Sequence, residues 1–305
     1  KFYERRARRI LPALFFVILC CAPFAYFWLL PDEFRRFGQS LIAVATFASN
    51  VYFWLKTDYF APDAENELLL HTWSLAVEEQ YYVLFPIFLM LLWKYSRHRL
   101  FWSTAIVAAI SFAFCEWAWR NDAVLNFYLL PSRAWELLVG SLVALWMASD
   151  SKPAAKTRLA REMIVGTGLA AIVVSTLVFD DSTPFPSYYA AIPTLGTALI
   201  IAFGSGQELT CRFLSWKPVV FIGLISYSAY LWHQPIFALL RIRGFGEFTE
   251  IHFLIGALAS LLLATLTWQF VEKPFRSRSA SADKKPTLTR NMIFGLSATG
   301  ICVFL

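Results

Sequence analysis

The stretch ILPALFFVILCCAPFAYFWLL occupies residues 10–30 and contains no charged residue. A helix needs about 20 consecutive apolar residues to cross the hydrocarbon core of a bilayer. Only helices and closed barrels span lipid, and barrel strands are alternating segments of about ten residues. This continuous apolar stretch therefore predicts a membrane-spanning helix.

The rest of the chain repeats this pattern of long apolar runs and short charged connections. Apolar types make up 58% of the 305 residues and charged types 16%, whereas soluble domains have about 45–50% and about 25%. We therefore predict an all-α, polytopic transmembrane helical bundle with about ten membrane segments. The expected segments are 10–30, 38–56, 72–94, 101–119, 133–148, 163–179, 190–204, 219–240, 252–271 and 291–305.

Lysine and arginine are concentrated in alternate loops, which sets the expected orientation. Loops 94–99, 152–161, 212–217 and 273–290 are basic, whereas loops 57–70 and 180–189 contain no lysine or arginine. The positive-inside rule places the basic loops in the cytoplasm.

The first part of the chain does not fit this alternation. Arg5, Arg6, Arg8 and Arg9 also predict a cytoplasmic start, so two full crossings before residue 57 would reverse every later loop. We interpret segment 38–56 as re-entrant.

Charge and cysteine content exclude other classes of protein. The net charge of +6 comes from the same basic loops, so it indicates membrane orientation and not a nucleic-acid partner. The five cysteines have no metal-ligand spacing. We expect them to be small packing residues and expect no metal.

Ionisable side chains inside membrane helices are costly and indicate function by default. The stretch HTWSLAVEEQYY at residues 71–82 places His71, Ser74, Glu78 and Tyr82 on one helix face. These side chains fit a proton-handling group. The other interpretation is an ordinary helix start with a capping hydroxyl and surface ion pairs.

Two further polar groups allow two interpretations each. Ser226, Tyr230 and His233 form a stripe that either faces a ligand or packs against another helix. Arg133 and Glu136, at i and i+3, are either a site or a structural ion pair. Gly140 on the same helix is expected to allow close helix approach.

Two basic groups, one before the first apolar run and one after residue 271, also allow a simple interpretation as membrane anchors. The cluster of Arg5, Arg6, Arg8 and Arg9 fits either cytoplasmic anchoring or a clamp for phosphate. The stretch EKPFR at residues 272–276 marks a helix exit and is expected to anchor it.

Taken in order, five stretches resemble the acyltransferase-3 family of membrane O-acyltransferases. They are residues 2–12, 71–82, 132–140, 226–235 and 272–276. The resemblance is to the branch of O-antigen and peptidoglycan O-acetylases that is often fused to an SGNH domain. It implies an acyltransferase domain over residues 1–272, a basic cytoplasmic linker at 273–290, and a further helix from 291 that leads to a missing extracytoplasmic domain.

The resemblance also implies roles for individual residues. Arg6 and Arg9, with Arg5, would hold acetyl-CoA at the cytoplasmic face. The candidate catalytic residues are Glu78, His71, His233 and Tyr230. The candidate substrate-binding or structural polar residues are Ser74, Arg133, Glu136 and Ser226.

One family residue has no counterpart in this sequence. The family's usual catalytic histidine lies in a helix that would precede Lys1, and no histidine here is assigned its role. We therefore expect this segment to be inactive alone.

The expected function is transfer of an acyl group, most simply acetyl from acetyl-CoA, to a hydroxyl of a cell-surface glycan. The acceptor would be lipopolysaccharide O-antigen, peptidoglycan, an exopolysaccharide or a lipid-linked sugar at the bacterial inner membrane. Such transfer needs a base for the hydroxyl proton and donors for the developing oxyanion. The alternatives are a multipass transporter or glycan flippase, and an inactive scaffold.

Overall fold

The computed structural model describes residues 2–56, 65–92, 96–149, 157–180, 182–243 and 249–277. The regular secondary structure of these residues is helical, as predicted. The chain divides into two compact units, Lys1–Ala76 with Phe221–Leu305, and Val77–Val220. The predicted final helix at 291–305, and the linker beyond residue 277, lie outside the described residues.

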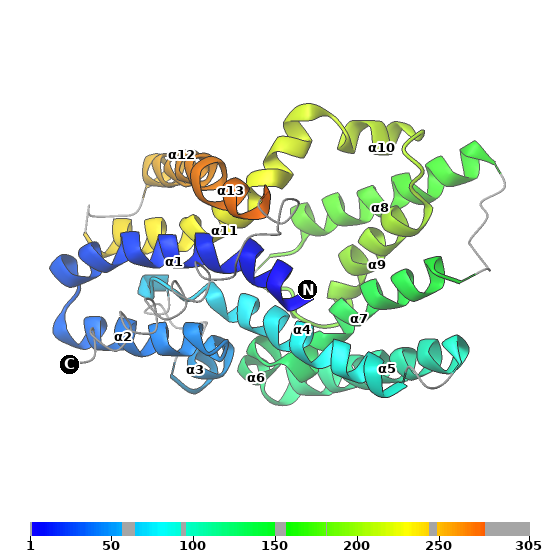
Figure 1. The fold of residues 1–305 in the computed structure, drawn as a ribbon, viewed down its shortest axis with the longest axis horizontal. Helices are drawn as coiled ribbons and strands as arrows, with labels where there is room; N and C mark the ends of the chain where they lie inside the picture. The colour runs from blue at the N-terminus through cyan, green and yellow to red at the C-terminus, as the bar shows by residue number, and fades with distance from the viewer. Residues whose placement is uncertain are drawn as a thin grey trace. The chain divides into compact units, whose positions relative to one another are not determined.

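The first unit begins with helix α1 (Phe2–Trp28). The helix starts earlier than the apolar run, so the arginine cluster is itself helical. Ile10, Leu14, Val17 and Cys21 recur at helical spacing, and all four are buried in the core of this unit. Figure 1 shows α1 running beside the next helix, α2 (Pro31–Ala45).

Segment 38–56 is not one helix. Helix α2 ends at Ala45, and α3 (Ser49–Lys56) begins after a turn in which Phe47 has a φ of 54°. The Tyr52 hydroxyl of α3 donates to the Arg36 carbonyl of α2 at 3.2 Å, so α3 folds back along α2. The expectation of one continuous helix here is wrong. The hairpin has the shape that a re-entrant segment needs, and the re-entrant topology stays a prediction.

The same unit is completed by the C-terminal helices. Helix α11 (Lys217–Ile242) has all but its first turn in this unit. Helix α12 (Glu250–Thr267) continues through a π-helical turn, Trp268–Glu272, into α13 (Lys273–Ser277). The π-helical turn and α13 both pack against α1.

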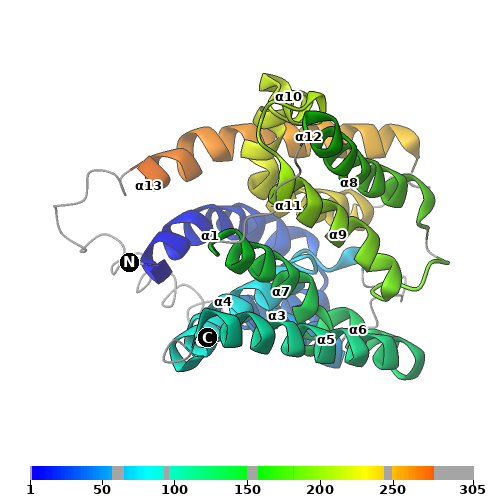
Figure 2. The ribbon, with the colours of Figure 1, turned by 90° about the vertical axis from the view of Figure 1, so that its right-hand side faces the viewer.

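The second unit contains most of α4 (Thr72–Leu92), whose first five residues belong to the first unit. Its other helices are α5 (Arg97–Asn121), α6 (Ala123–Tyr128), α7 (Leu130–Met147), α8 (Arg158–Val178), α9 (Tyr188–Phe203) and α10 (Leu209–Leu214). Helix α5 pairs with α7, and α8 lies beside α9 (Figure 2).

Helices α8 and α9 approach closely at two glycines that were not selected from the sequence. A Cβ added to Gly168 of α8 would lie 2.6 Å from the Gly196 carbonyl oxygen of α9, and the reverse distance is the same. Gly140 of α7 would meet nothing within 4 Å. The prediction that Gly140 allows close packing is therefore wrong, and Gly168 and Gly196 have that role.

Five of the described helices are long and apolar enough to cross a membrane, so the expected count of about ten is not confirmed. They are Phe2–Trp28, Thr72–Leu92, His98–Asn121, Arg158–Val178 and Glu250–Arg276. Several large apolar side chains point outward, including Leu177, which is 79% exposed, and Phe27, which is 77% exposed. Such exposure is expected of lipid-facing side chains and indicates a multi-pass membrane protein.

Candidate functional site

Two of the predicted motifs meet inside the first unit. The Ser74 hydroxyl, in the first turn of α4, lies 2.9 Å from the Tyr230 hydroxyl of α11. The Tyr230 hydroxyl donates its proton to the His71 carbonyl oxygen, so it accepts from Ser74. The start of α4 and the middle of α11 are thereby joined by hydrogen bonds.

Two imidazole rings lie beside this hydrogen-bonded pair. The ring centroids of His71 and His233 are 5.4 Å apart, and those of His71 and Tyr230 are 5.1 Å apart. The His233 Nδ1 bonds the Tyr230 carbonyl oxygen. A carbonyl can only accept, so Nδ1 carries the proton and the neutral ring keeps a free lone pair on Nε2.

His71 is the most unusual polar side chain in the group. His71 is 7% exposed, and neither of its ring nitrogens has a hydrogen-bond partner among the described residues. Burying a polar group without a partner is costly, and in native proteins such a group calls for an explanation, such as an unseen water or a ligand. His71 therefore marks a place where a bound molecule can be recognised.

The segment before α4 holds His71 in position. Leu68, Leu69 and Leu70 are buried in the core of this unit. The Thr72 hydroxyl donates to the Leu69 carbonyl at 2.6 Å. Burial raises the pKa of the nearby Glu67 carboxyl, while the Arg36 guanidinium, 2.8 Å away, opposes this shift.

The structure does not place every predicted residue in this cluster. Glu78, one turn after Ser74 on α4, is exposed, whereas the adjacent Glu79 is buried. Ser226 is also exposed, and it donates to the Gly223 carbonyl of its own helix. Ser226 is therefore not part of the buried group, and its role as a ligand-facing residue stays a prediction.

A buried carboxylate on the π-helical turn was not selected from the sequence. The Glu272 side chain is 1% exposed, accepts from the Ser228 hydroxyl at 3.1 Å and pairs with Arg276 at 2.9 Å. The sequence interpretation assigned this stretch to anchoring alone. The sequence feature that could have indicated a buried Glu272 is a carboxylate at the end of an apolar run.

The arginine cluster occupies the first turns of α1. Arg5 and Arg9 are exposed and Arg6 is half-buried. Arg8 pairs with Glu4 at 2.6 Å. Arg6 and Arg9, three positions apart, lie on one side of the helix.

Arg133 and Glu136 lie in the second unit and form the predicted ion pair, with Arg133 Nε 3.1 Å from Glu136 Oε1. The Arg133 guanidinium also lies over the rings of Phe127 and Phe185, at 5.8 and 5.7 Å from their centroids. Glu136 lines a cavity of about 230 Å³ with residues of α7 and α9, among them Gly140 and Thr194. This local pair was predicted correctly, and its assignment to a site or to structure stays a prediction.

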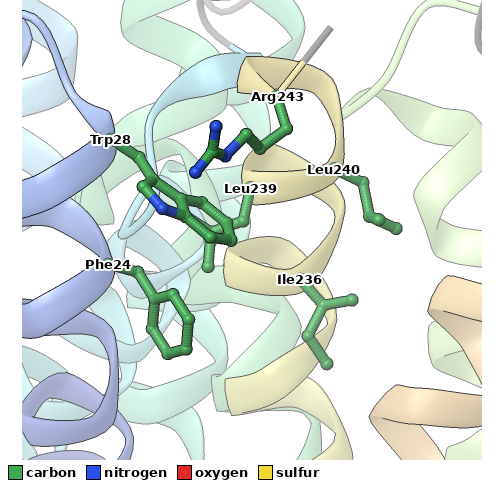
Figure 3. A pocket seen from close by; sticks show the side chains of 6 residues that line it. All are labelled: Phe24, Trp28, Ile236, Leu239, Leu240 and Arg243. Carbon is green, nitrogen blue, oxygen red and sulfur yellow. The ribbon is translucent and has the colours of Figure 1, made fainter. Parts of the chain in front are cut away.

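A larger pocket in the first unit is apolar. It has a volume of about 570 Å³ and lies between the end of α1 and the end of α11. Phe24 and Trp28 point into it from α1, and the Arg243 guanidinium covers the Trp28 ring at 4.4 Å (Figure 3). Ile236, Leu239 and Leu240 complete the lining. None of these side chains can accept a proton at neutral pH, so the pocket is not where the chemistry of the polar cluster occurs.

The described residues contain no group of three or more metal-ligating side chains. Of the cysteines, Cys21, Cys115 and Cys211 are buried and unpaired, and Cys20 is half-buried.

Comparisons with known proteins bear on what this arrangement does. BcsY of Komagataeibacter xylinus, named as a membrane-bound transacylase, is 30% identical over 268 residues, which are 87% of this chain and 66% of that protein. The O-acetyltransferase OatA of Staphylococcus aureus is 29% identical over 92% of this chain and 48% of its own length. YrhL of Bacillus subtilis, named as a peptidoglycan O-acetyltransferase, is 26% identical over 91% of this chain and 45% of its own length.

The chain thus spans roughly half to two thirds of the length of these relatives. No solved structure matches it. The sequence profile of the acyltransferase-3 family, described as an acyltransferase domain, matches residues 1–269. The chain therefore belongs to the acyltransferase-3 family, as the order of its motifs predicted.

Proposed function

We propose that the protein is a membrane O-acyltransferase that moves acetyl from cytoplasmic acetyl-CoA to a hydroxyl of a cell-surface glycan at the bacterial inner membrane. The observation that carries this proposal is the meeting of His71, His233, Tyr230 and Ser74 in one unit. Two relatives are named as O-acetyltransferases, one of them acting on peptidoglycan. Peptidoglycan is therefore the first acceptor to test.

The polar cluster contains the groups that this transfer needs. An imidazole nitrogen takes the proton of the acceptor hydroxyl as its oxygen bonds the acetyl carbon. The carbon–sulfur bond of the thioester breaks, and the coenzyme A sulfur receives the proton. His233 Nε2 has the free lone pair that the first step requires. The Ser74 hydroxyl can turn from the Tyr230 oxygen and donate to the oxyanion that develops, while Tyr230 keeps its bond to the His71 carbonyl.

The proposed direction of transfer follows the charges. We assign Arg5, Arg6 and Arg9 to the donor, because a guanidinium matches the oxygens of the coenzyme A phosphates. Positive charge at the cytoplasmic side also attracts an anionic cytosolic ligand. The loop before His71 contains no lysine or arginine from residue 57 to 70, which supports an external acceptor on this side of the cluster.

The test is transfer of labelled acetyl from acetyl-CoA to peptidoglycan by membranes that contain the natural full-length protein. We expect His71→Gln and His233→Gln to reduce transfer by about 10²–10⁴-fold, the usual effect of losing a general base. His98→Gln is the matched control, because His98 is exposed on α5 in the other unit. Unchanged transfer by both His71→Gln and His233→Gln would rule out this site.

A further inference from the structure

The residue after His233 makes an unusual contact with the segment that carries His71. The side-chain Nε2 of Gln234 lies 3.0 Å from the Glu67 carbonyl oxygen and 3.2 Å from the Glu65 carbonyl oxygen. Carbonyl oxygens only accept, so the amino side of the Gln234 amide must face them. One side chain of α11 thereby bridges two backbone groups of the segment from Glu65 to Leu70.

This segment has further connections to α11: Leu68 and Leu69 share a hydrophobic core with Leu231 and Ala238, and Arg241 Nη1 lies 3.4 Å from the Glu65 carbonyl oxygen. The Glu67 carbonyl also accepts from the Leu70 amide at 3.2 Å, which closes a turn directly before His71. Arg241 pairs with Glu65 at 2.9 Å, but the Glu65 side chain is 60% exposed. Exposed ion pairs are screened by solvent and contribute little. The half-buried amide of Gln234 is therefore the more effective link.

We propose that Gln234 is a positioning residue that holds the segment from Glu65 to Leu70 against α11, so that His71 stands beside His233 and Tyr230. His233 would then supply one imidazole of the site, and the adjacent Gln234 would hold the segment that carries the other imidazole, His71. This inference rests on the proposed function for its catalytic consequence. The placement of His71 can be tested separately from that function.

Two substitutions separate a clamp from simple packing. Gln234→Glu keeps nearly the same shape but turns a carboxylate oxygen toward two carbonyl oxygens. Gln234→Met keeps a similar volume and removes the donor without adding charge. A misplacement of about 1 Å near a reacting group reduces rates by about 10²-fold.

We therefore expect a graded loss of acetyl transfer in the full-length protein. Gln234→Met should lose about tenfold and Gln234→Glu about 10²-fold, with the KM for acetyl-CoA unchanged because its phosphates are assigned to Arg5, Arg6 and Arg9. If Gln234 only fills space, Gln234→Met should behave like the wild type. That result would overturn the clamp.

The second readout does not depend on activity. Diethyl pyrocarbonate modifies exposed imidazoles, and mass spectrometry reports the rate at each histidine. His71 should react slowly in the wild type, because it is 7% exposed, and at least severalfold faster in Gln234→Glu. Exposed His98 provides the internal reference, and its rate should not change. A changed His98 rate would signal general unfolding of Gln234→Glu. The rate at which His71 is modified in Gln234→Met would then test the clamp.

The two measurements keep the proposals apart. Slow modification of His71 in both Gln234 variants would overturn the clamp even if His71→Gln abolishes transfer. Fast modification of His71 in Gln234→Glu, together with full transfer by His71→Gln, would support the clamp and overturn the proposed function.

Discussion

The hydroxyls of Ser74 and Tyr230 lie 2.9 Å apart, although the two residues are 156 positions apart in the sequence. Tyr230 also donates to the His71 carbonyl, so one phenol connects two residues at the start of α4. The same phenol stands next to both imidazoles. It is therefore placed to orient Ser74 and the two imidazoles.

Tyr230→Phe should reduce acetyl transfer by the full-length protein by about 10²-fold, because it removes the hydroxyl that positions Ser74 and the segment of His71, and a misplacement of about 1 Å has an effect of this size. Tyr227→Phe is the matched control, because the Tyr227 hydroxyl donates to the Ile10 carbonyl of α1 at 2.9 Å and not to the cluster. Initial rates with labelled acetyl-CoA give the comparison. Equal losses in the two variants would show that Tyr230 has no special role.

Alanine substitutions at two glycines of the second unit should have different effects on the free energy of unfolding. Gly168→Ala should lower the free energy of unfolding by about 1–3 kcal/mol, because its Cβ would lie 2.6 Å from the Gly196 carbonyl oxygen. Gly140→Ala should leave stability unchanged or raise it by up to about 1 kcal/mol, because alanine favours the helix and the space beside Gly140 is open. Denaturant unfolding of the full-length protein in detergent measures both. Destabilisation by Gly140→Ala would contradict this packing.

Two serines of α11 should respond differently to alanine. Ser228 is fully buried and donates to the Glu272 carboxylate. Its loss should lower the free energy of unfolding by about 1–3 kcal/mol, because hydrogen bonds to buried charges are strong. Ser226→Ala should have almost no effect, since that hydroxyl is exposed and bonds its own helix. The same unfolding assay compares the pair, and equal effects would count against a buried Glu272 site.

Glu67 gives a pH dependence whose sign can be worked out. Its folded pKa is raised by burial, so the folded segment binds this proton more tightly than the unfolded chain does. The protonated Glu67 carboxyl therefore contributes its full stabilisation of the folded segment at low pH. This contribution is lost as the pH rises through the folded pKa. Glu67→Gln should protect residues 65–71 from hydrogen exchange at least as well as the wild type at pH 7.

This advantage should disappear as the pH falls to about 4, below the ordinary pKa of glutamate. The ion pair alone would predict the opposite result, faster exchange in Glu67→Gln, because this substitution removes the partner of Arg36. Faster exchange of residues 65–71 in Glu67→Gln at neutral pH would show that the ion pair outweighs the burial.

The features that sequence predicted well are local ones. Apolar runs predicted the helices because their length and continuity are set by the bilayer. The Arg133–Glu136 pair was predicted because three positions on one helix always bring side chains together. The polar residues at 71, 74, 230 and 233 were selected because polar side chains are rare in such helices.

The features that sequence missed depend on tertiary packing. The break after Ala45 has no glycine or proline between residues 45 and 49 to signal it. Ser226 and Ser228 are equally polar, and helical periodicity alone does not say which of them is buried against Glu272. The π-helical turn at Trp268–Glu272 changes the direction of the side chains that follow it, so the burial of Glu272 could not be read from an α-helical pattern.

The central claim is that the start of α4 and the middle of α11 form one functional site. A double-mutant cycle with Ser74→Ala and Tyr230→Phe, measured as acetyl transfer by the full-length protein, tests it most directly. If the two hydroxyls act together, the double variant should be no more than about threefold slower than Tyr230→Phe alone, since coupled groups are not additive. If the two losses multiply in full, the hydroxyls act independently and the claim of a single site is contradicted.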